Sequence, residues 1–243
     1  METRAEITNL LGALKAHLAF HRDLGLDPPP VSSKRPKIKA PAVHGSLKTE
    51  ADLTHLDSLE SLRRHIGDCK RCQLHQSRNR LVFGEGSPSA RLVFVGEAPG
   101  QEENREGRPF VGESGRLLTR IIENGMGLKR GDIYLCNIVK CHPPRNRDPE
   151  ADEMTTCLPF LKRQLAIIRP EVICTLGLVA LRGLLGKPLT MKSDRGTWHT
   201  YEGIPLMPTY HPAYLLRNAS AKRQVWDDIK KVMARLGLEV SKK

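Results

Sequence analysis

The chain has 243 residues, of which 39% are hydrophobic, and it carries a formal net charge of +12 at pH 7. This length allows one sizeable core with appendages or two small domains, and no apolar run approaches the ~20 residues of a membrane-spanning helix. The basic charge favours an anionic polymer, usually nucleic acid, as the partner, and a merely basic surface is the alternative.

The first segment and the cysteine content bear on cellular location. Residues 1–18 carry acids early and lack a small-residue cleavage site after an apolar block, so we expect no secretory signal. Six cysteines in such a chain favour reduced thiols or metal ligands over disulfides. We therefore expect a cytoplasmic protein.

The N-terminal fifth of the chain differs in composition from the rest. Apolar residues recur at three- and four-residue steps over residues 2–25, which predicts a helix. Residues 27–48 are rich in proline, lysine and serine, which is typical of a flexible basic linker. Residues 1–26 are thus expected to form a helical appendage, which docks on the body, on a protein partner or on nothing.

From residue 50 to residue 240 the pattern becomes that of a globular domain. Short, nearly continuous apolar runs predict buried strands at 91–95, 132–140, 171–177 and 204–210. Helices are predicted at 53–68, 112–127, 148–170, 178–185 and 222–237. Strands alternating with helices predict an α/β fold with three α/β/α layers around a mainly parallel four-stranded sheet, which binds ligands at the carboxyl ends of its strands.

The helix predicted at 148–170 has marked boundary signals. Asp148 is expected to be its N-cap, with Pro149 at the first helical position and acids in the first turn. Pro159 should kink or split this helix just after Cys157.

A glycine-rich loop, "VGEAPGQEENREGRPFVGESG" at 95–115, follows the first strand. It lacks the Gly-Lys-Ser/Thr of a P-loop, and its acids make it a poor phosphate cradle. Its backbone amides, its carboxylates and the aromatic Phe110 suit a neutral polar ring better. The alternative is an acidic surface turn with Phe110 as a core plug.

Two further stretches end strands and carry polar side chains. Asn137 closes the second strand, and its amide can read the paired donor and acceptor of a pyrimidine edge, or simply cap the strand. His211 begins the proline-stiffened turn "YHPAYLLRN" after the last strand, where a structural role is the alternative.

Several residues near these strand ends are candidates for DNA contact. Leu215 and its neighbour Leu216 are either ordinary packing or an apolar wedge that enters a base stack. The candidate phosphate contacts are arginines at loop positions: Arg145, Arg147, Arg195 and Arg217.

The cysteines divide into two groups. Cys136 and Cys174 fall inside apolar strands and are expected in the core. The four that remain, at loops or helix ends, are Cys69, Cys72, Cys141 and Cys157. Four thiolates fit zinc or a [4Fe–4S] cluster equally well by ligand count, and the sequence context of the C-x-x-C pair does not favour a redox dithiol.

These stretches together resemble the family-4 uracil-DNA glycosylases, which are bacterial and archaeal iron–sulfur repair enzymes. "CKRCQL" with "RNRLVFGEG", "GEAPGQEENREGRPFVGESGRLL", "NIVKCHPPRNRDP" and "YHPAYLLRN" are similar to the family's motifs and occur in the family's order. The resemblance covers about residues 60–236 and leaves residues 1 to about 55 outside. It implies a [4Fe–4S] cluster, with all four of the loop and helix-end cysteines as ligands.

The resemblance also implies roles for pocket residues. Phe110 would stack on a flipped-out uracil, Asn137 would hydrogen-bond its edge, and His211 would donate to its O2 side. Glu97, with the amides around Gly96 and Ala98, would line the pocket and place the water. Glu103 would crowd the 5-position of the base and help to refuse thymine.

The resemblance implies a glycosylase that removes uracil from single- or double-stranded DNA, leaves an abasic site and acts as a monomer. Ala98 stands where the best-known branch of these enzymes has an aspartate, so we expect catalysis to depend mostly on stabilising the departing anion. Turnover is expected rather than covalent capture, because the loop after Cys141 has no inserted histidine-bearing segment, and no pocket lysine indicates lyase activity. The alternatives are another deaminated base, such as hypoxanthine or xanthine, and a non-catalytic iron–sulfur DNA-binding protein.

Overall fold

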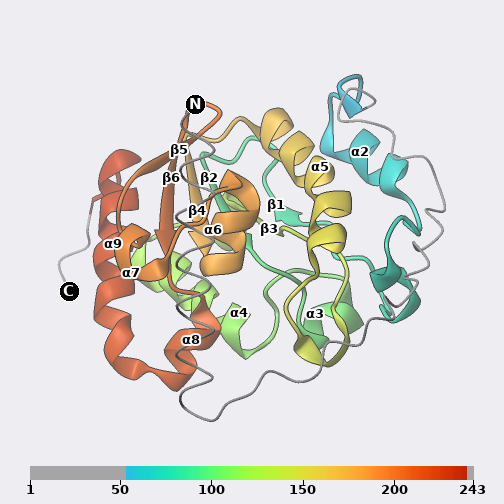
Figure 1. Cartoon of the computed structure of the whole chain (residues 1–243). Helices are drawn as coiled ribbons and strands as arrows, with labels where there is room; N and C mark the ends of the chain where they lie inside the picture. Colours follow the sequence, from blue (N-terminus) through green and yellow to red (C-terminus); the bar gives the residue numbers. More distant parts are fainter. Residues whose placement is uncertain (1–52, 240–243) are drawn as a thin grey trace, which may run out of the picture. The chain divides into compact units, whose positions relative to one another are not determined.

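The computed structural model describes residues 53–239, and Figure 1 shows their arrangement. The strands are β1 (Glu85–Gly86), β2 (Leu92–Gly96), β3 (Tyr134–Asn137), β4 (Val172–Leu176), β5 (His199–Tyr201) and β6 (Ile204–Thr209). The helices are α2 (Leu59–Ile66), α3 (Gln101–Glu106), α4 (Glu113–Arg120), α5 (Ala151–Ile168), α6 (Leu178–Leu185), α7 (Met191–Asp194), α8 (Pro212–Arg217) and α9 (Lys222–Arg235). The helical appendage and linker predicted for 1–48 lie outside the described residues.

One mixed sheet has the strand order β1-β3-β2-β4-β6-β5. The four inner strands are parallel, as predicted, whereas β1 and β5 pair antiparallel at the two edges. These edge strands were not predicted, because they have only two and three residues and show no periodic pattern. The prediction of a four-stranded sheet is therefore corrected to six strands, and the α/β class is confirmed.

The core lies on both faces of the sheet because side chains alternate along each strand. In β2, Val93 and Val95 pack in the cluster that includes residues of α2, α5 and α6. Leu92 and Phe94 point the other way, into the cluster that includes residues of α4 and α9. Both faces are covered by helices, so the inner strands are continuous apolar runs rather than alternating ones.

The helix after β3 begins later than predicted and is not split. Its N-cap is Glu150, and Glu153 closes a capping box by accepting from the Glu150 N–H at 2.8 Å. Asp148 is therefore not the cap. Pro159 lies inside one continuous helix, α5. Phe160 and Leu161, which are buried, hold the helix against the sheet on the far side of the proline, which offsets its cost of about 3 kcal/mol.

The direction in which the chain adds strands to the sheet reverses at β2, which is a topological switch point. From β2 the chain moves to β3 on one side, and β4 then pairs on the other side. Crevices form outside the carboxyl ends of strands at such points. No helix in the described residues 53–239 is long and apolar enough to cross a membrane.

Candidate active site and cysteine pocket

A cleft of about 500 Å³ opens where the carboxyl ends of the parallel strands meet. It is lined by Glu97, Ala98, Pro99, Gly100, Glu103, Phe110, Ser114, Asn137, Pro143, Asn146, Arg147, His211, Ala213, Tyr214 and Arg217. Every predicted pocket residue except Gly96 is in this lining. The sheet therefore brings together segments that are up to 120 residues apart in sequence.

Asn137 is the last residue of β3 and is 2% exposed. Its Oδ1 is buried and has no hydrogen-bond partner among the described residues. A buried acceptor without a partner is costly, and natural proteins keep such groups mostly where a ligand completes the bond. Asn137 thus supplies an open acceptor at the cleft.

Gly96 lies behind this side chain. A Cβ at this position would lie 2.4 Å from Asn137 Oδ1 and 2.7 Å from the Phe110 ring. Any larger residue would displace one of these two side chains. Gly96 therefore belongs to the site by leaving room for Asn137 and Phe110 instead of lining the cleft.

Phe110 occupies a tight turn with a φ of 53°, in the left-handed region. Glu103 holds this turn, because its Oε1 accepts from the backbone N–H groups of Val111 and Gly112, each at 2.9 Å. The Phe110 ring lies 6.2 Å from the His211 ring, tilted by 33°. Glu103 lines the cleft as predicted, and it also fixes the position of the aromatic ring.

His211 caps α8 by accepting the Ala213 N–H on its Nδ1 at 3.1 Å. Burial lowers the pKa of His211 to about 4. The imidazole is therefore neutral near pH 7, and since Nδ1 accepts, the proton is assigned to Nε2. The cleft receives a neutral N–H donor at this point.

The pKa of Glu97 is shifted upwards, in the opposite direction to that of His211. Burial, reinforced by the nearby Asp148 carboxyl group, raises the pKa of Glu97 to about 7. A carboxyl group that titrates near neutrality in a cleft is typical of an acid–base or water-orienting group. The next residue, Ala98, has no carboxylate of its own, so Glu97 is the acid at this turn.

Two of the predicted DNA-contact residues need correction. Leu215 is 1% exposed and packs in the core, so it is not a wedge in this structure; the exposed leucine is Leu216, at 39%. Arg195 Nη1 lies 2.7 Å from an Asp228 carboxylate oxygen, and its guanidinium lies over the Tyr210 ring. Its charge is neutralised within the protein, which argues against a phosphate contact.

The other three arginines differ in their surroundings. Arg217 and Arg147 line the cleft, and Arg145 is exposed on the same loop as Arg147. Arg147 is also held by Glu153 through two hydrogen bonds of 2.7 and 2.9 Å. Arg217 and Arg145 are thus the freer candidates for phosphate contact.

Sequence reasoning missed several lining residues, among them Asn146 and Tyr214. Asn146 lies in the loop after β3 next to Arg145, both at positive φ. Tyr214 is 38% exposed and its ring centroid lies 4.7 Å from that of Tyr210. The pattern Tyr-x-x-x-Tyr around the predicted histidine was the available sign of this pair.

The four loop and helix-end cysteines line one small apolar pocket. Cys69 and Cys72 follow α2, and Cys141 follows β3. Cys157 was predicted near a helix end, but it lies inside α5, because the helix continues through Pro159. Cys136 and Cys174 are buried in their strands, as predicted. The structure therefore brings together all four predicted ligand positions.

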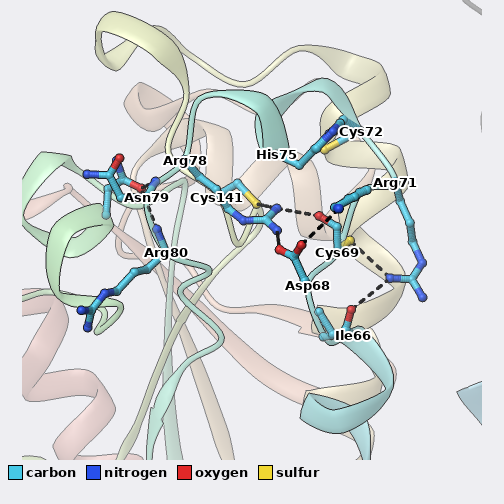
Figure 2. A network of polar contacts seen from close by, with 12 residues as sticks. Ile66, Asp68, Cys69, Arg71, Cys72, His75, Arg78, Asn79, Arg80 and Cys141 are labelled. Carbon is cyan, nitrogen blue, oxygen red and sulfur yellow. Dashed lines mark hydrogen bonds and ion pairs between the residues drawn. The ribbon is translucent and has the colours of Figure 1, made fainter.

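Donor groups surround these sulfurs. Arg78 Nη1 donates to Cys141 Sγ at 3.2 Å and to the Cys69 carbonyl at 2.6 Å, and Arg71 donates to Cys69 Sγ at 3.3 Å. The Lys140 backbone N–H donates to Cys157 Sγ at 3.3 Å. Figure 2 shows Arg78 between Asp68, Cys69 and Cys141. Cationic and N–H donors suit sulfurs that carry negative charge as metal ligands.

The positions of the four cysteines can be compared with the ligand geometries of a zinc ion and a [4Fe–4S] cluster. A tetrahedral zinc requires all its sulfurs about 2.3 Å from one point, whereas a [4Fe–4S] cube spreads its four thiolates around its corners. No group of three or more His, Cys, Asp or Glu residues in the part of the chain described here is arranged to hold one ion. Four cysteines line one pocket, and this number matches the ligand count of either centre.

Comparison with known proteins agrees with this geometry. A family model described as the uracil DNA glycosylase superfamily matches residues 83–230. The type-4 uracil-DNA glycosylase of Sulfurisphaera tokodaii is 43% identical over 185 residues, covering 73% of this chain and 84% of that protein. That of Thermotoga maritima is 44% identical over 184 residues, covering 73% and 94%. The type-5 uracil-DNA glycosylase of Thermus thermophilus is 38% identical over 152 residues, covering 54% and 68%.

Proposed function

This chain belongs to the type-4 uracil-DNA glycosylases of the uracil DNA glycosylase superfamily, and from that premise we propose that it excises uracil from DNA. It binds DNA, rotates a deoxyuridine out of the base stack and hydrolyses the N-glycosidic bond. The products are free uracil and an abasic site. This is the first step of a base excision repair pathway.

The observation that carries the proposal is the buried Asn137 Oδ1, which has no hydrogen-bond partner within residues 53–239 and lines the same cleft as the neutral His211. Oδ1 would accept the N3–H of uracil, and the amide nitrogen would donate to O4. His211 Nε2–H would donate to O2 as negative charge develops there. Cytosine, which lacks the N3–H, would leave the buried Oδ1 unpaired, and the cleft would reject it.

The other cleft residues have supporting roles in this mechanism. Phe110, held by Glu103, stacks on the flipped base. Glu97 orients the water that attacks the sugar carbon as the bond to uracil breaks. Because Ala98 supplies no second carboxylate, stabilisation of the departing anion carries most of the rate enhancement.

We also propose that Cys69, Cys72, Cys141 and Cys157 ligate a [4Fe–4S] cluster. When bound, the cluster supplies a covalent cross-link between segments that are distant in sequence, and it takes no part in bond cleavage. The glycosylase domain spans residues 50–240, acts as a monomer inside the cell, and carries residues 1–26 as an appendage that could dock a protein partner.

The test is uracil release by the purified brown protein, with iron and acid-labile sulfide measured on the same sample. Single- and double-stranded oligonucleotides with one uracil should both lose the base, and cytosine and thymine controls should not. A fully loaded protein that releases no uracil from either strand form would contradict the proposal.

A further inference from the structure

A buried lysine lies between the cysteine pocket and the candidate active site. Lys140 is 1% exposed, which is rare for a lysine. Its Nζ donates to the Asn137 carbonyl at 2.8 Å and to Gln164 Oε1 at 2.6 Å. Its backbone N–H donates to Cys157 Sγ. A single residue thus contacts both the base-reading asparagine and a cluster cysteine.

The bonds around Lys140 form a closed interior network. Gln164, fully buried, donates from Nε2 to the Phe83 carbonyl at 2.9 Å and to the Tyr134 hydroxyl at 3.0 Å. The Lys140 carbonyl accepts from Val82 at 2.8 Å. Such a network fixes the turn after β3 in one conformation, because each buried group would lose its partner if the turn moved.

The Lys140 side chain is held by short contacts in the interior. It lines the cysteine pocket together with Cys141 and Cys157. The two acceptors of its Nζ, the Asn137 carbonyl and Gln164 Oε1, are both neutral and both buried. The position of Nζ is therefore fixed by groups that would lose a buried hydrogen bond if the side chain moved.

We propose that Lys140 is a positioning residue that couples the iron–sulfur cluster to uracil recognition. The ligand Cys157 would hold the Lys140 backbone, and Lys140 Nζ would hold the Asn137 carbonyl, so that Asn137 Oδ1 faces the flipped base. This inference rests on the proposed function and adds to it a route by which the cluster state reaches the active site.

The first test is Lys140→Met, which removes the hydrogen bond from Nζ to the Asn137 carbonyl and keeps the backbone N–H to Cys157. In variant protein with full iron and sulfide content, single-turnover uracil release at saturating DNA should fall about tenfold to 10²-fold, as expected for a misplaced recognition group. Affinity for undamaged duplex should stay within about twofold, since no phosphate contact is lost. Lys187→Met, at an exposed position outside both pockets, is the matched control.

A second readout does not depend on activity. Lys140 lines the cysteine pocket, so replacing its polar side chain with methionine should lower the midpoint potential of the cluster, because the reduced cluster carries more negative charge and would lose a nearby N–H donor. A loaded Lys140→Met protein with unchanged rate and unchanged potential would overturn the inference. If the loaded wild-type protein releases no uracil, the proposed function fails, and the potential alone decides whether Lys140 acts on the cluster.

If Lys140→Met does not accumulate with iron, Gln164→Glu decides. This variant gives Lys140 Nζ a carboxylate acceptor, which holds the side chain more firmly and makes its position less dependent on Cys157. Stepwise iron removal should then lower uracil release less steeply in Gln164→Glu than in the wild-type protein. Equal loss in both would overturn the coupling.

Discussion

Burial moves the pKa values of two cleft residues, Glu97 and His211, in directions that suit opposite tasks. The histidine is kept neutral, so it donates a hydrogen bond without carrying charge into the pocket. The pKa of the glutamate is raised to about 7, so the charge of its carboxyl group depends on pH in the physiological range. Environments that separate two titratable groups in this way are typical of acid–base sites.

The Glu97 carboxylate should control the pH profile. With a pKa of about 7, it becomes protonated as the pH falls below that value, and it then orients water poorly. Single-turnover uracil release should therefore decline below pH 7 in the wild-type protein. Glu97→Gln should lose this inflection and about 10²-fold in rate at pH 8. The same inflection in both proteins would assign the titration to another group.

Glu97→Gln should lose activity, but its folding stability at high pH should increase. A raised pKa means that the folded state holds the proton more tightly, so folding stability falls as the pH rises from about 4.5 to about 7. Above that range, Glu97→Gln should unfold at a higher temperature than the wild-type protein. A lower melting temperature at pH 8 would show that the carboxylate contributes to the fold.

His211→Asn separates the two roles of the histidine. Asparagine is a good N-cap, so it can still accept the Ala213 N–H and preserve α8. It is too short to present a donor where Nε2 does. The single-turnover rate should fall about 10²–10³-fold with little change in melting temperature. A matched loss of stability and rate would make the residue structural.

At the scale of elements, the loop from β2 to α4 positions Phe110 by close backbone contact. A Cβ on Gly115 would lie 2.0 Å from the Phe110 carbonyl carbon and oxygen, which are backbone atoms and cannot swing aside. Gly115→Ala should therefore displace the turn and lower uracil release at least tenfold, as a misplaced stacking ring would.

The control for this loop is Gly131→Ala. A Cβ there meets nothing within 4 Å, and its φ is not in the left-handed region. Equal rates for the two alanine variants would show that the turn tolerates movement of Phe110.

Arg78 connects the end of α2 to the exit of β3. It joins Cys69 and Cys141, and Asp68 holds its guanidinium at 2.6 Å (Figure 2). Arg78→Lys keeps a positive charge and loses the planar fork, so iron should be lost faster under a chelator. Arg80→Lys, two residues away and exposed, is the comparison. Equal rates of iron loss would mean that charge alone suffices.

Whether an element could be predicted from the sequence depends on its length and on its burial. The four inner strands were predictable because burial on both faces makes them short apolar runs. The edge strands β1 and β5 were not, since two or three residues show no periodicity and their pairing is long-range. The start of α5 was misplaced because aspartate is a favoured N-cap residue and glutamate is not, whereas the helix begins after Glu150 with a capping box to Glu153.

Candidate site residues were predictable where a strand ended in a polar side chain, as at Asn137. They were not predictable where tertiary packing decides which way a side chain faces. Leu215 and Leu216 are adjacent and equally apolar, and only the packing of α8 buries the first. Arg195 is neutralised by Asp228, which is 33 residues later.

At the scale of the whole molecule, the net charge of +12 should strengthen DNA binding and make the affinity depend on salt. Each phosphate contact contributes about −0.9 to the slope of log affinity against log salt on duplex DNA. Residues 27–48, which include Lys34, Arg35, Lys37 and Lys39, are proposed to add such contacts as a basic linker. Deleting residues 1–48 should therefore make the slope shallower by about one to four.

The same deletion should leave chemistry intact, because the residues of the described range 53–239 that line the cleft and the cysteine pocket all lie after residue 60. Single-turnover release at saturating DNA and low salt should match the full chain. Arg217→Ala in the full chain offers a calibration, since loss of one phosphate contact should change the slope by about one. An unchanged slope with a lower saturating rate would instead mean that residues 1–48 support the active site, and the proposed role as a linker would be wrong.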